Sequence, residues 1–254
     1  MSALLVLSGV TRGFYGVPVL RGVTFSVAEG SFTGLIGPNG AGKSTLFNVV
    51  SGLYPAEAGR IRFGAEEATR TSADARVRAG LVRSFQLARG FPRLSVFQHL
   101  MLHGPAQPGD RLGAALAGGR AAKDHEAALA EEALAVARRL RLDHVIDNPV
   151  TALSGGQKKL LEIGRALMAR PRMILLDEPM AGVNPSLAQE IGDHLTAINR
   201  AGITILLIEH DMALIRRLCD PVIVMAEGAV LAEGPFAAVA ANPMVQEAYL
   251  GRRH

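Results

Sequence analysis

The chain has very little cysteine. Its 254 residues include a single one, Cys219, so a disulfide framework is excluded. Cys219 has no C-x-x-C neighbour and no nearby histidine cluster, and it therefore does not indicate a metal site. A reducing cytosol fits this composition.

Long apolar runs are also missing. The apolar runs at residues 203–208 and 173–176, like the others in the chain, are far shorter than the roughly 18 residues that a membrane-spanning helix needs. The first residues, Met1-Ser2-Ala3-Leu4, lack the charged region and cleavage site of a secretory signal. We therefore expect a chain that is neither threaded through a membrane nor exported.

Charge of one sign is not concentrated anywhere in the chain. The formal net charge is +4, which could indicate nucleic acid or an anionic membrane surface as a partner. The Arg and Lys residues are scattered, however, and this favours an ordinary solvated surface over a polyanion-binding patch. We expect no nucleic-acid partner.

What the chain does contain is the balance of a globular protein, with 49% apolar and 20% charged residues. In the first third, Val23, Phe25 and Val27 alternate in the manner of a strand. A second strand at 31–36 runs into a glycine-rich turn, a helix follows at 43–50, and short strands are predicted at 60–63 and 81–85. The first third is therefore expected to be rich in β-structure.

The middle third, 86–169, has no strong strand pattern, whereas 127–140 has apolar residues at helical spacing. Residues 104–120 have no clear period and suggest an irregular excursion. In the last third, apolar strands at 173–176, 204–208 and 222–225 alternate with helices at 186–199 and 212–218. Strands that are apolar on both faces and separated by helices predict an α/β fold with a covered parallel sheet.

A phosphate-binding loop is predicted between the strand at 31–36 and the helix at 43–50. The motif G-x-x-x-x-G-K-[ST] is formed by Gly37, Pro38, Asn39, Gly40, Ala41, Gly42, Lys43 and Ser44. Its glycines let backbone N–H groups point at phosphate oxygens, and the helix presents its positive end to the same anion. Lys43 would neutralise the β- and γ-phosphates, Ser44 would ligate Mg²⁺, and Thr45 extends the site. The alternative is a glycine turn with a coincidental Lys-Ser pair.

Two carboxylates, Asp177 and Glu178, follow the apolar strand at 173–176. They emerge at the carboxyl edge of the predicted sheet, where ligands bind in open α/β folds. Asp177 would hold Mg²⁺ directly or through water, and Glu178 would orient and deprotonate an attacking water. The alternative is an acidic turn without function.

A third element is formed by Ser154, Gly155, Gly156 and Gln157, which precede a helix. Alone, this segment would favour a flexible linker or a helix start. It is accompanied by further elements in a fixed order: the phosphate loop, Gln86 after a strand, residues 153–157, Asp177-Glu178, and His210 after the strand at 204–208.

With these five motifs in this order, nearly the whole chain resembles the ATP-binding subunits of ABC transporters. The resemblance implies a P-loop NTPase core with a parallel sheet, an N-terminal antiparallel β subdomain and a helical insert. It places the core at 1–85 and 170–254 and the helical subdomain at 86–169. It also implies ATP and Mg²⁺ as ligands, with hydrolysis coupled to transport across a membrane.

The resemblance assigns roles to further residues. Gln86 would sense the γ-phosphate and Mg²⁺ and couple the site to the membrane partner, and His210 would contact the γ-phosphate. For His210 alone, an ordinary strand-end histidine is the alternative. Tyr15 matches the aromatic residue that stacks on adenine, and because Phe14 is adjacent, core packing competes with that role.

The resemblance also implies a dimer, in which residues Ser154 to Gln157 of one subunit cap the γ-phosphate bound to the other. A helix N-terminus with small residues and a hydroxyl is a second anion site, and one compact subunit cannot easily grip a nucleotide with two helix N-termini. One position departs from the family pattern: Asn184 stands where many members have aspartate. An amide can hydrogen-bond across a dimer but carries no charge.

Looser details resemble the subunits that serve branched-chain amino acid uptake, namely residues 83–86, 209–212, 242–243 and 248–251, with Phe91, Leu94, Val96 and His103. The implied partners are transmembrane permease subunits and a second ATP-binding subunit, identical or related, at the cytoplasmic face of the membrane. Urea or amide uptake and lipopolysaccharide export use similar ATPases. Two functions outside transport also stay open on the sequence: an ABC ATPase acting on nucleic acid or ribosomes, and an unrelated phosphate-loop kinase or GTPase.

Overall fold

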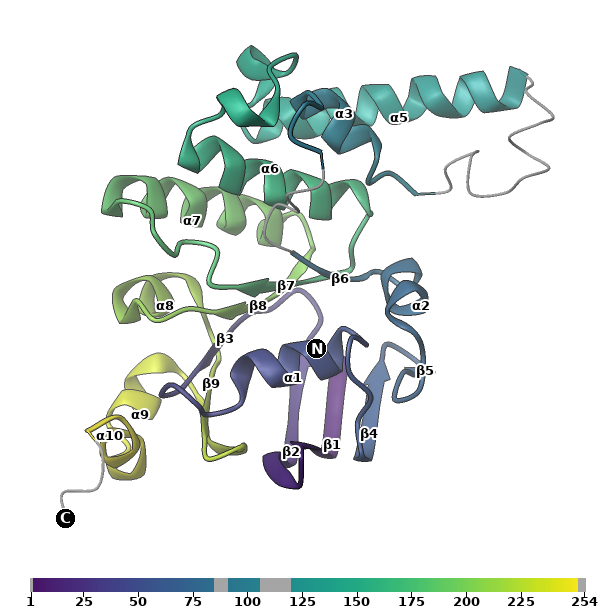
Figure 1. Cartoon of the computed structure of the whole chain (residues 1–254). Coiled ribbons are helices and arrows are strands. Elements are labelled where there is room, and N and C mark those ends of the chain that lie inside the picture. Colours follow the sequence, from purple (N-terminus) through teal and green to yellow (C-terminus); the bar gives the residue numbers. More distant parts are fainter. Residues whose placement is uncertain (1, 85–90, 106–119, 251–254) are drawn as a thin grey trace. The chain divides into compact units, whose positions relative to one another are not determined.

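The computed structural model describes residues 2–84, 91–105 and 120–250, and the chain folds as two compact units (Figure 1). Residues 1–83 and 172–254 form the first unit, which we call the core unit. Residues 84–171 form the second, the helical unit. Of the predicted site residues, Gln86 lies outside the described residues.

A six-stranded sheet forms the centre of the core unit. Its strands are β3 (Phe32–Ile36), β6 (Leu81–Arg83), β7 (Met173–Asp177), β8 (Thr204–Ile208), β9 (Val222–Ala226) and β10 (Ala229–Gly234), in the order β10-β9-β3-β8-β7-β6. All neighbouring pairs are parallel except β9 with β10. Every residue of β3 and β8 is buried. The predicted α/β fold with a covered parallel sheet is confirmed.

Helices cover both faces of this sheet. Figure 1 shows α7 (Pro185–Arg200) and α8 (Met212–Leu218) on one face and α1 (Lys43–Val50) on the other. Two short helices, α9 (Phe236–Ala240) and α10 (Pro243–Leu250), follow β10. The carboxyl ends of the parallel strands are left open at one edge, and the loops after β3, β7 and β8 meet there.

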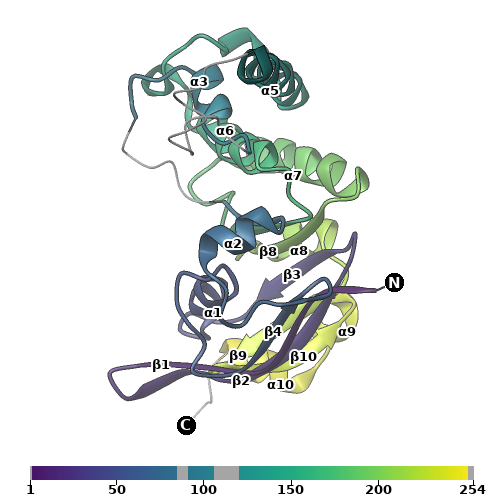
Figure 2. The ribbon, with the colours of Figure 1, turned by 90° about the vertical axis from the view of Figure 1, so that its right-hand side faces the viewer.

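A four-stranded antiparallel sheet packs on the other side of α1. It contains β1 (Ala3–Phe14), β2 (Val17–Ala28), β4 (Ala58–Phe63) and β5 (Glu66–Glu67) in the order β2-β1-β4-β5. Leu46 and Phe47 of α1 are fully buried in a cluster that joins residues of both sheets. The β1–β2 hairpin projects from this sheet (Figure 2). The predicted antiparallel β subdomain is thus present.

The carboxyl end of α1 is held by Arg76 of α2 (Ala73–Arg78). Its guanidinium is 3% exposed and donates to the carbonyls of Val49 (2.6 Å), Val50 (2.7 Å) and Ala68 (2.6 Å). The last carbonyls of a helix have no partner within the helix. Arg76 supplies donors for them, together with a positive charge at the negative end of the helix dipole.

The helical unit contains α3 (Val96–Met101), α5 (Arg120–Arg139), α6 (Gly155–Met168) and two 3₁₀ turns, Asp143–Val145 and Val150–Ala152. The helix predicted at 127–140 is confirmed as part of α5, where Leu129, Ala133 and Ala137 are buried. Within the described part of this unit no strand occurs, and the only β-pairing is an isolated bridge between Ser95 and Pro149.

Some boundaries differ from the sequence predictions. The strand expected at 81–85 ends at Arg83, and the helix expected at 127–140 begins earlier, at Arg120. Most of the stretch expected to be irregular, 104–120, lies outside the described residues. The edge strand β10 and the helices α9 and α10 were not predicted. None of the described helices has the length and apolar character needed to cross a bilayer.

Candidate active site

The loop between β3 and α1 turns sharply at its glycines. Gly37, Gly40 and Gly42 have φ angles of 152°, 80° and 93°, a region that L side chains rarely adopt. A Cβ at Gly37 would lie 2.1 Å from the carbonyl oxygen of Met225 in β9. A side chain is therefore excluded where the loop leaves the sheet, and the backbone can curl tightly before α1 begins.

Lys43 is the first residue of α1 and is 7% exposed. Its Nζ donates to the carbonyls of Gly37 (2.7 Å) and Pro38 (3.1 Å), so that the ammonium lies within the loop. Burial lowers the pKa of Lys43, and the carboxylates of Glu178 and Asp177 partly oppose this. The predicted cation and the two predicted carboxylates thus interact electrostatically.

A cavity of about 220 Å³ lies over the phosphate loop. Along the loop it is lined by Asn39, Gly40, Ala41, Gly42, Lys43, Ser44 and Thr45, and its remaining wall is formed by Val19, Glu178 and His210. The structure therefore brings together three motifs that are far apart in the sequence. They meet at the carboxyl edge of the parallel sheet.

Glu178 and His210 are in direct contact, with 2.6 Å between Glu178 Oε1 and His210 Nε2. Glu178 has φ of 50°, an uncommon conformation for a residue with a side chain. Its N–H donates to the carbonyl of Ile208 at the end of β8 (2.9 Å). The turn after β7 is therefore tied to the end of β8, next to His210.

Asp177 is the last residue of β7 and forms an ion pair with Arg83 of β6, at 2.9 Å between Oδ2 and Nη2. The same guanidinium also donates to the side-chain oxygen of Asn48 in α1. Arg83 therefore links Asp177 at the end of β7 to helix α1, which follows the phosphate loop.

Tyr15 lies in the turn between β1 and β2, is fully exposed, and is not among the residues that line the cavity. Core packing, the competing role for this residue, is wrong. Its neighbour Phe14 packs instead, edge-on against Tyr54 with 5.3 Å between the ring centroids.

Ser154 and Gln157 form a capping box at the start of α6 in the helical unit. Ser154 Oγ accepts from the Gln157 N–H (3.2 Å), and Gln157 Oε1 accepts from the Ser154 N–H (2.9 Å). Gly155 and Gly156 lie in the first helical turn. The motif is therefore a helix start, and its role toward a nucleotide stays a prediction.

Asn184 caps α7, and its Oδ1 accepts from the Leu187 N–H (2.9 Å). Aspartate and asparagine are about equally good at such a position. The local fold therefore explains why an amide can replace a carboxylate here.

Sequence reasoning did not give a role to Glu209, the residue between β8 and His210. Its side chain is buried, at 5% exposure, and desolvation raises its pKa. An acid directly after a strand is usually a surface residue, so only the adjacency to His210 could have drawn attention to it. Cys219 is also buried, and burial raises the pKa of its thiol to about 12, so it is no nucleophile at neutral pH.

Protein side chains alone do not form a metal centre in the described ranges, which contain no suitable group of three or more His, Cys, Asp or Glu. Ser44 lines the cavity, and Asp177, which is not among the lining residues, immediately precedes Glu178, which is. Hydroxyl and carboxylate oxygens suit Mg²⁺, which keeps several waters and usually binds with substrate phosphates. The donor set therefore fits Mg²⁺ bound together with a nucleotide.

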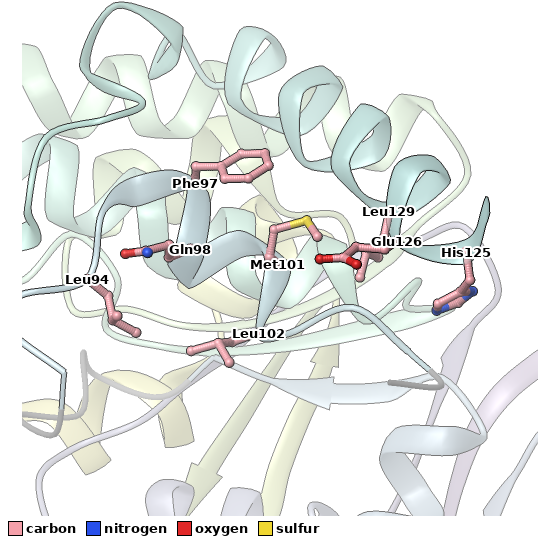
Figure 3. A pocket seen from close by; sticks show the side chains of 8 residues that line it. All are labelled: Leu94, Phe97, Gln98, Met101, Leu102, His125, Glu126 and Leu129. Atoms are coloured by element: carbon pink, nitrogen blue, oxygen red, sulfur yellow. The ribbon is translucent and has the colours of Figure 1, made fainter. Parts of the chain in front are cut away.

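The helical unit has a groove of its own, between α3 and α5 (Figure 3). Its cavity of about 530 Å³ is lined mainly by apolar side chains, including Leu94, Phe97, Met101 and Leu129. Leu102, which also lines the groove, and Phe91, which precedes α3, are more than half exposed. Exposed apolar surface of this kind marks interaction sites.

A family model described as "ABC transporter" matches residues 20–181, well over half of the chain. The chain belongs to the ABC transporter family. The resemblance drawn from the five motifs is confirmed. As a member of this family, the chain is an ATP-binding subunit of a transporter, and it is an ATPase. A second model, "Branched-chain amino acid ATP-binding cassette transporter", matches residues 229–254.

Several relatives of this ABC protein are similar over almost their whole length. The probable branched-chain amino acid transport ATP-binding protein LivG of Archaeoglobus fulgidus is 36% identical, over 98% of this chain and 95% of that protein. LivG of Methanocaldococcus jannaschii is 37% identical, over 98% and 97%. The lipopolysaccharide export system ATP-binding protein LptB of Escherichia coli is 32% identical, over 98% of each.

Solved structures agree with this family. The ADP conformation of an ATP-binding cassette of an ABC transporter has a TM-score of 0.85 at 35% identity and covers 99% of this chain and 100% of that one. A nucleotide-free cassette has a TM-score of 0.86 at 36% identity, with the same coverage. The fold and the family therefore agree over the full chain.

Proposed function

We propose that the cavity over the phosphate loop is where this ABC ATPase binds and hydrolyses ATP. The observation that carries the proposal is the meeting of the phosphate loop, Glu178 and His210 in one cavity of the core unit. Each motif alone has a plain structural explanation. Together at the carboxyl edge of a parallel sheet, they provide a cation, a base and a hydrogen-bonding partner for one anionic substrate.

ATP would bind with its phosphates against the curled loop and the start of α1. Backbone N–H groups and the positive end of the helix dipole face that position. Lys43 Nζ, now donating to the carbonyls of Gly37 and Pro38, would exchange these acceptors for β- and γ-phosphate oxygens. Burial of Lys43 strengthens this attraction because water screens it poorly.

Hydrolysis would transfer the γ-phosphoryl group to water. Glu178 takes a proton from the attacking water, the bond between the bridging oxygen and the γ-phosphorus breaks, and ADP and phosphate leave. His210 would orient the Glu178 carboxylate through their 2.6 Å contact, and because it lines the same cavity as the phosphate loop it would donate to the γ-phosphate. Mg²⁺, held by Ser44, Asp177 and Gln86, would neutralise charge that develops on the phosphate oxygens.

A second copy, or a related subunit, would complete the site. The N-terminus of α6, with Ser154, Gly155, Gly156 and Gln157, is a second anion site on the helical unit. Placed across a dimer interface, it would cap the γ-phosphate, so that ATP closes the dimer and hydrolysis opens it. Tyr15, fully exposed in the β1–β2 turn, is free to stack on adenine.

We further propose that the transported substrate is a branched-chain amino acid and that the chain works at the cytoplasmic face of the membrane with transmembrane permease subunits. The match of residues 229–254 to a branched-chain amino acid cassette model supports this substrate. The apolar groove between α3 and α5 (Figure 3) suits a permease segment. Lipopolysaccharide export is the second candidate, because LptB is similar over 98% of the chain.

Lys43→Ala tests the phosphate site. Loss of a buried cation that faces two phosphates should weaken ATP binding by about a hundredfold, on the basis of roughly 1.5–3 kcal/mol for each charge-assisted hydrogen bond. Lys123→Ala, which removes an exposed lysine of α5, is the matched control. Titration with a fluorescent ATP analogue gives both affinities, and equal affinities would remove the assignment. Leucine uptake against lipopolysaccharide export in cells that lack the gene separates the two candidate substrates.

A further inference from the structure

Glu209 is unusual among the buried residues of this protein. In the described part of the chain it is the only acidic residue classed as buried, at 5% exposure. Burying a carboxylate is costly unless hydrogen bonds replace its lost water. The donors that Glu209 receives therefore explain why the fold retains it.

Two backbone N–H groups supply those hydrogen bonds. Oε1 accepts from the Met180 N–H at 2.8 Å, and Oε2 accepts from the His210 N–H at 3.2 Å. Met180 lies two residues after Glu178, and His210 is the partner of the Glu178 side chain. Each oxygen thus binds one of the two loops that carry the proposed hydrolytic groups.

The turn that carries Glu178 needs such support. Glu178 has φ of 50°, a left-handed conformation that is unfavourable for a residue with a side chain. Its N–H donates to the Ile208 carbonyl (2.9 Å), and its own carbonyl accepts from Ala181 (3.1 Å). Glu209 adds the bond between Met180 and the residue that follows β8, so the turn is tied to β8 at two successive points.

We propose that Glu209 is a positioning residue for ATP hydrolysis, and that its carboxylate holds the Glu178 turn and His210 in the relative geometry that the reaction needs. This inference rests on the proposed function of the cavity over the phosphate loop. Glu209 does not touch the substrate in this scheme. It acts through the backbone of Met180 and of His210.

The geometry also says which side chain can do this. Both oxygens face N–H donors, so two acceptors are required, and only a carboxylate offers two acceptors without a donor. Glutamine has nearly the same shape but carries an NH₂ group in place of one oxygen. In Glu209→Gln one buried N–H would therefore face another N–H and lose its partner.

The test compares Glu209→Gln with Glu66→Gln, an exposed glutamate on the edge strand β5, which makes the same change of charge. We expect kcat for ATP to fall about tenfold in Glu209→Gln, because losing one buried hydrogen bond costs about 1.4 kcal/mol. The affinity for a fluorescent ATP analogue should change less than twofold. Unchanged kcat would overturn the proposal. So would a parallel loss of nucleotide affinity and melting temperature, which is the signature of a purely structural role.

Two further measurements separate the possible failures. In a double-mutant cycle, Glu209→Gln should add little to the loss already caused by His210→Ala, and full additivity contradicts positioning. Hydrogen exchange on the wild type should show protected amides at Met180 and His210, and fast exchange there refutes the contacts even if Glu209→Gln does not fold. If Lys43→Ala binds ATP with unchanged affinity, the proposed site is wrong. If Lys43→Ala loses ATP binding but Glu209→Gln keeps the wild-type kcat, only the inference about Glu209 is refuted.

Discussion

Glu178→Gln separates binding of ATP from its hydrolysis. The replacement keeps the shape of the side chain and an oxygen that can accept from His210 Nε2, now 2.6 Å away. It removes only the basic group. A general base contributes roughly 10²- to 10⁴-fold, so turnover should fall by at least a hundredfold, or about 3 kcal/mol in the activation free energy.

The cost to folding should be small. The side chains of His210 and Glu178 are 47% and 39% exposed, and water screens a pair of this kind to about 1 kcal/mol or less. Binding of ATP should be equal or slightly tighter, because a negative charge next to the γ-phosphate is removed. A variant that binds ATP without hydrolysing it should accumulate as a closed dimer.

Three assays on one preparation decide the matter: phosphate release, titration with a fluorescent ATP analogue, and light scattering after gel filtration in ATP and Mg²⁺. Glu131→Gln, an exposed position on α5, is the control for loss of one carboxylate. If Glu178→Gln still hydrolyses ATP and stays monomeric, both the role of Glu178 and the dimer are wrong. If it loses ATP binding as well, the side chain holds the loop rather than activating water.

Three other predictions concern stability. Gly37→Ala should lower the free energy of unfolding in urea by about 2–4 kcal/mol, because the added Cβ meets the Met225 carbonyl. Gly16→Ala, with open space around its Cβ, should lower it by about 1 kcal/mol. Equal losses in the two variants would contradict the close packing at Gly37. Arg76→Met removes the donors to the end of α1 and should cost about 3 kcal/mol, so an unchanged denaturation midpoint would refute this. Burial and Arg165 lower the pKa of His103, whose Nε2 accepts from Arg165 Nε (3.0 Å). As the pH falls, His103 is protonated first in the unfolded chain, near pH 6.5. The stability that the neutral imidazole contributes is therefore present above that pH and is lost on acidification toward pH 5. In thermal melts across this range, His103→Gln should make the melting temperature depend less on pH.

The sequence predicted those elements whose signals are local. The helix at 43–50, the strand at 204–208 and the helix at 212–218 were found with the boundaries that α1, β8 and α8 have. A strong apolar period and clear stop residues define each of them. The strand β10 was missed because its residues are only partly buried. The helix α9 has only five residues, too few to show a period, and α10, although as long as α1, has a weaker amphipathic pattern.

The candidate site divides in the same way. The phosphate loop, Glu178 and His210 follow strands directly, and in a parallel sheet the ends of strands meet at one edge, so their proximity could be predicted. The contact of Glu209 with the Met180 N–H could not, because that backbone group lies in a loop 29 residues away. The bond between Arg83 and Asp177, 94 residues apart, likewise depends on the pairing of β6 with β7.

The two chain connections to the helical unit are mechanically unequal. Strands β6 and β7 are parallel neighbours, so the chain leaves the core unit at the carboxyl edge of the sheet, after Arg83, and returns at the opposite edge, at Arg172. Arg172 is anchored by its N–H to the Gly80 carbonyl (2.9 Å), away from the phosphate loop. A pull on residue 84 therefore acts directly on the guanidinium that holds Asp177, while a pull on residue 171 acts on an anchored strand end. Of the two connections, the one at residue 84 therefore adjoins the ion pair between Arg83 and Asp177.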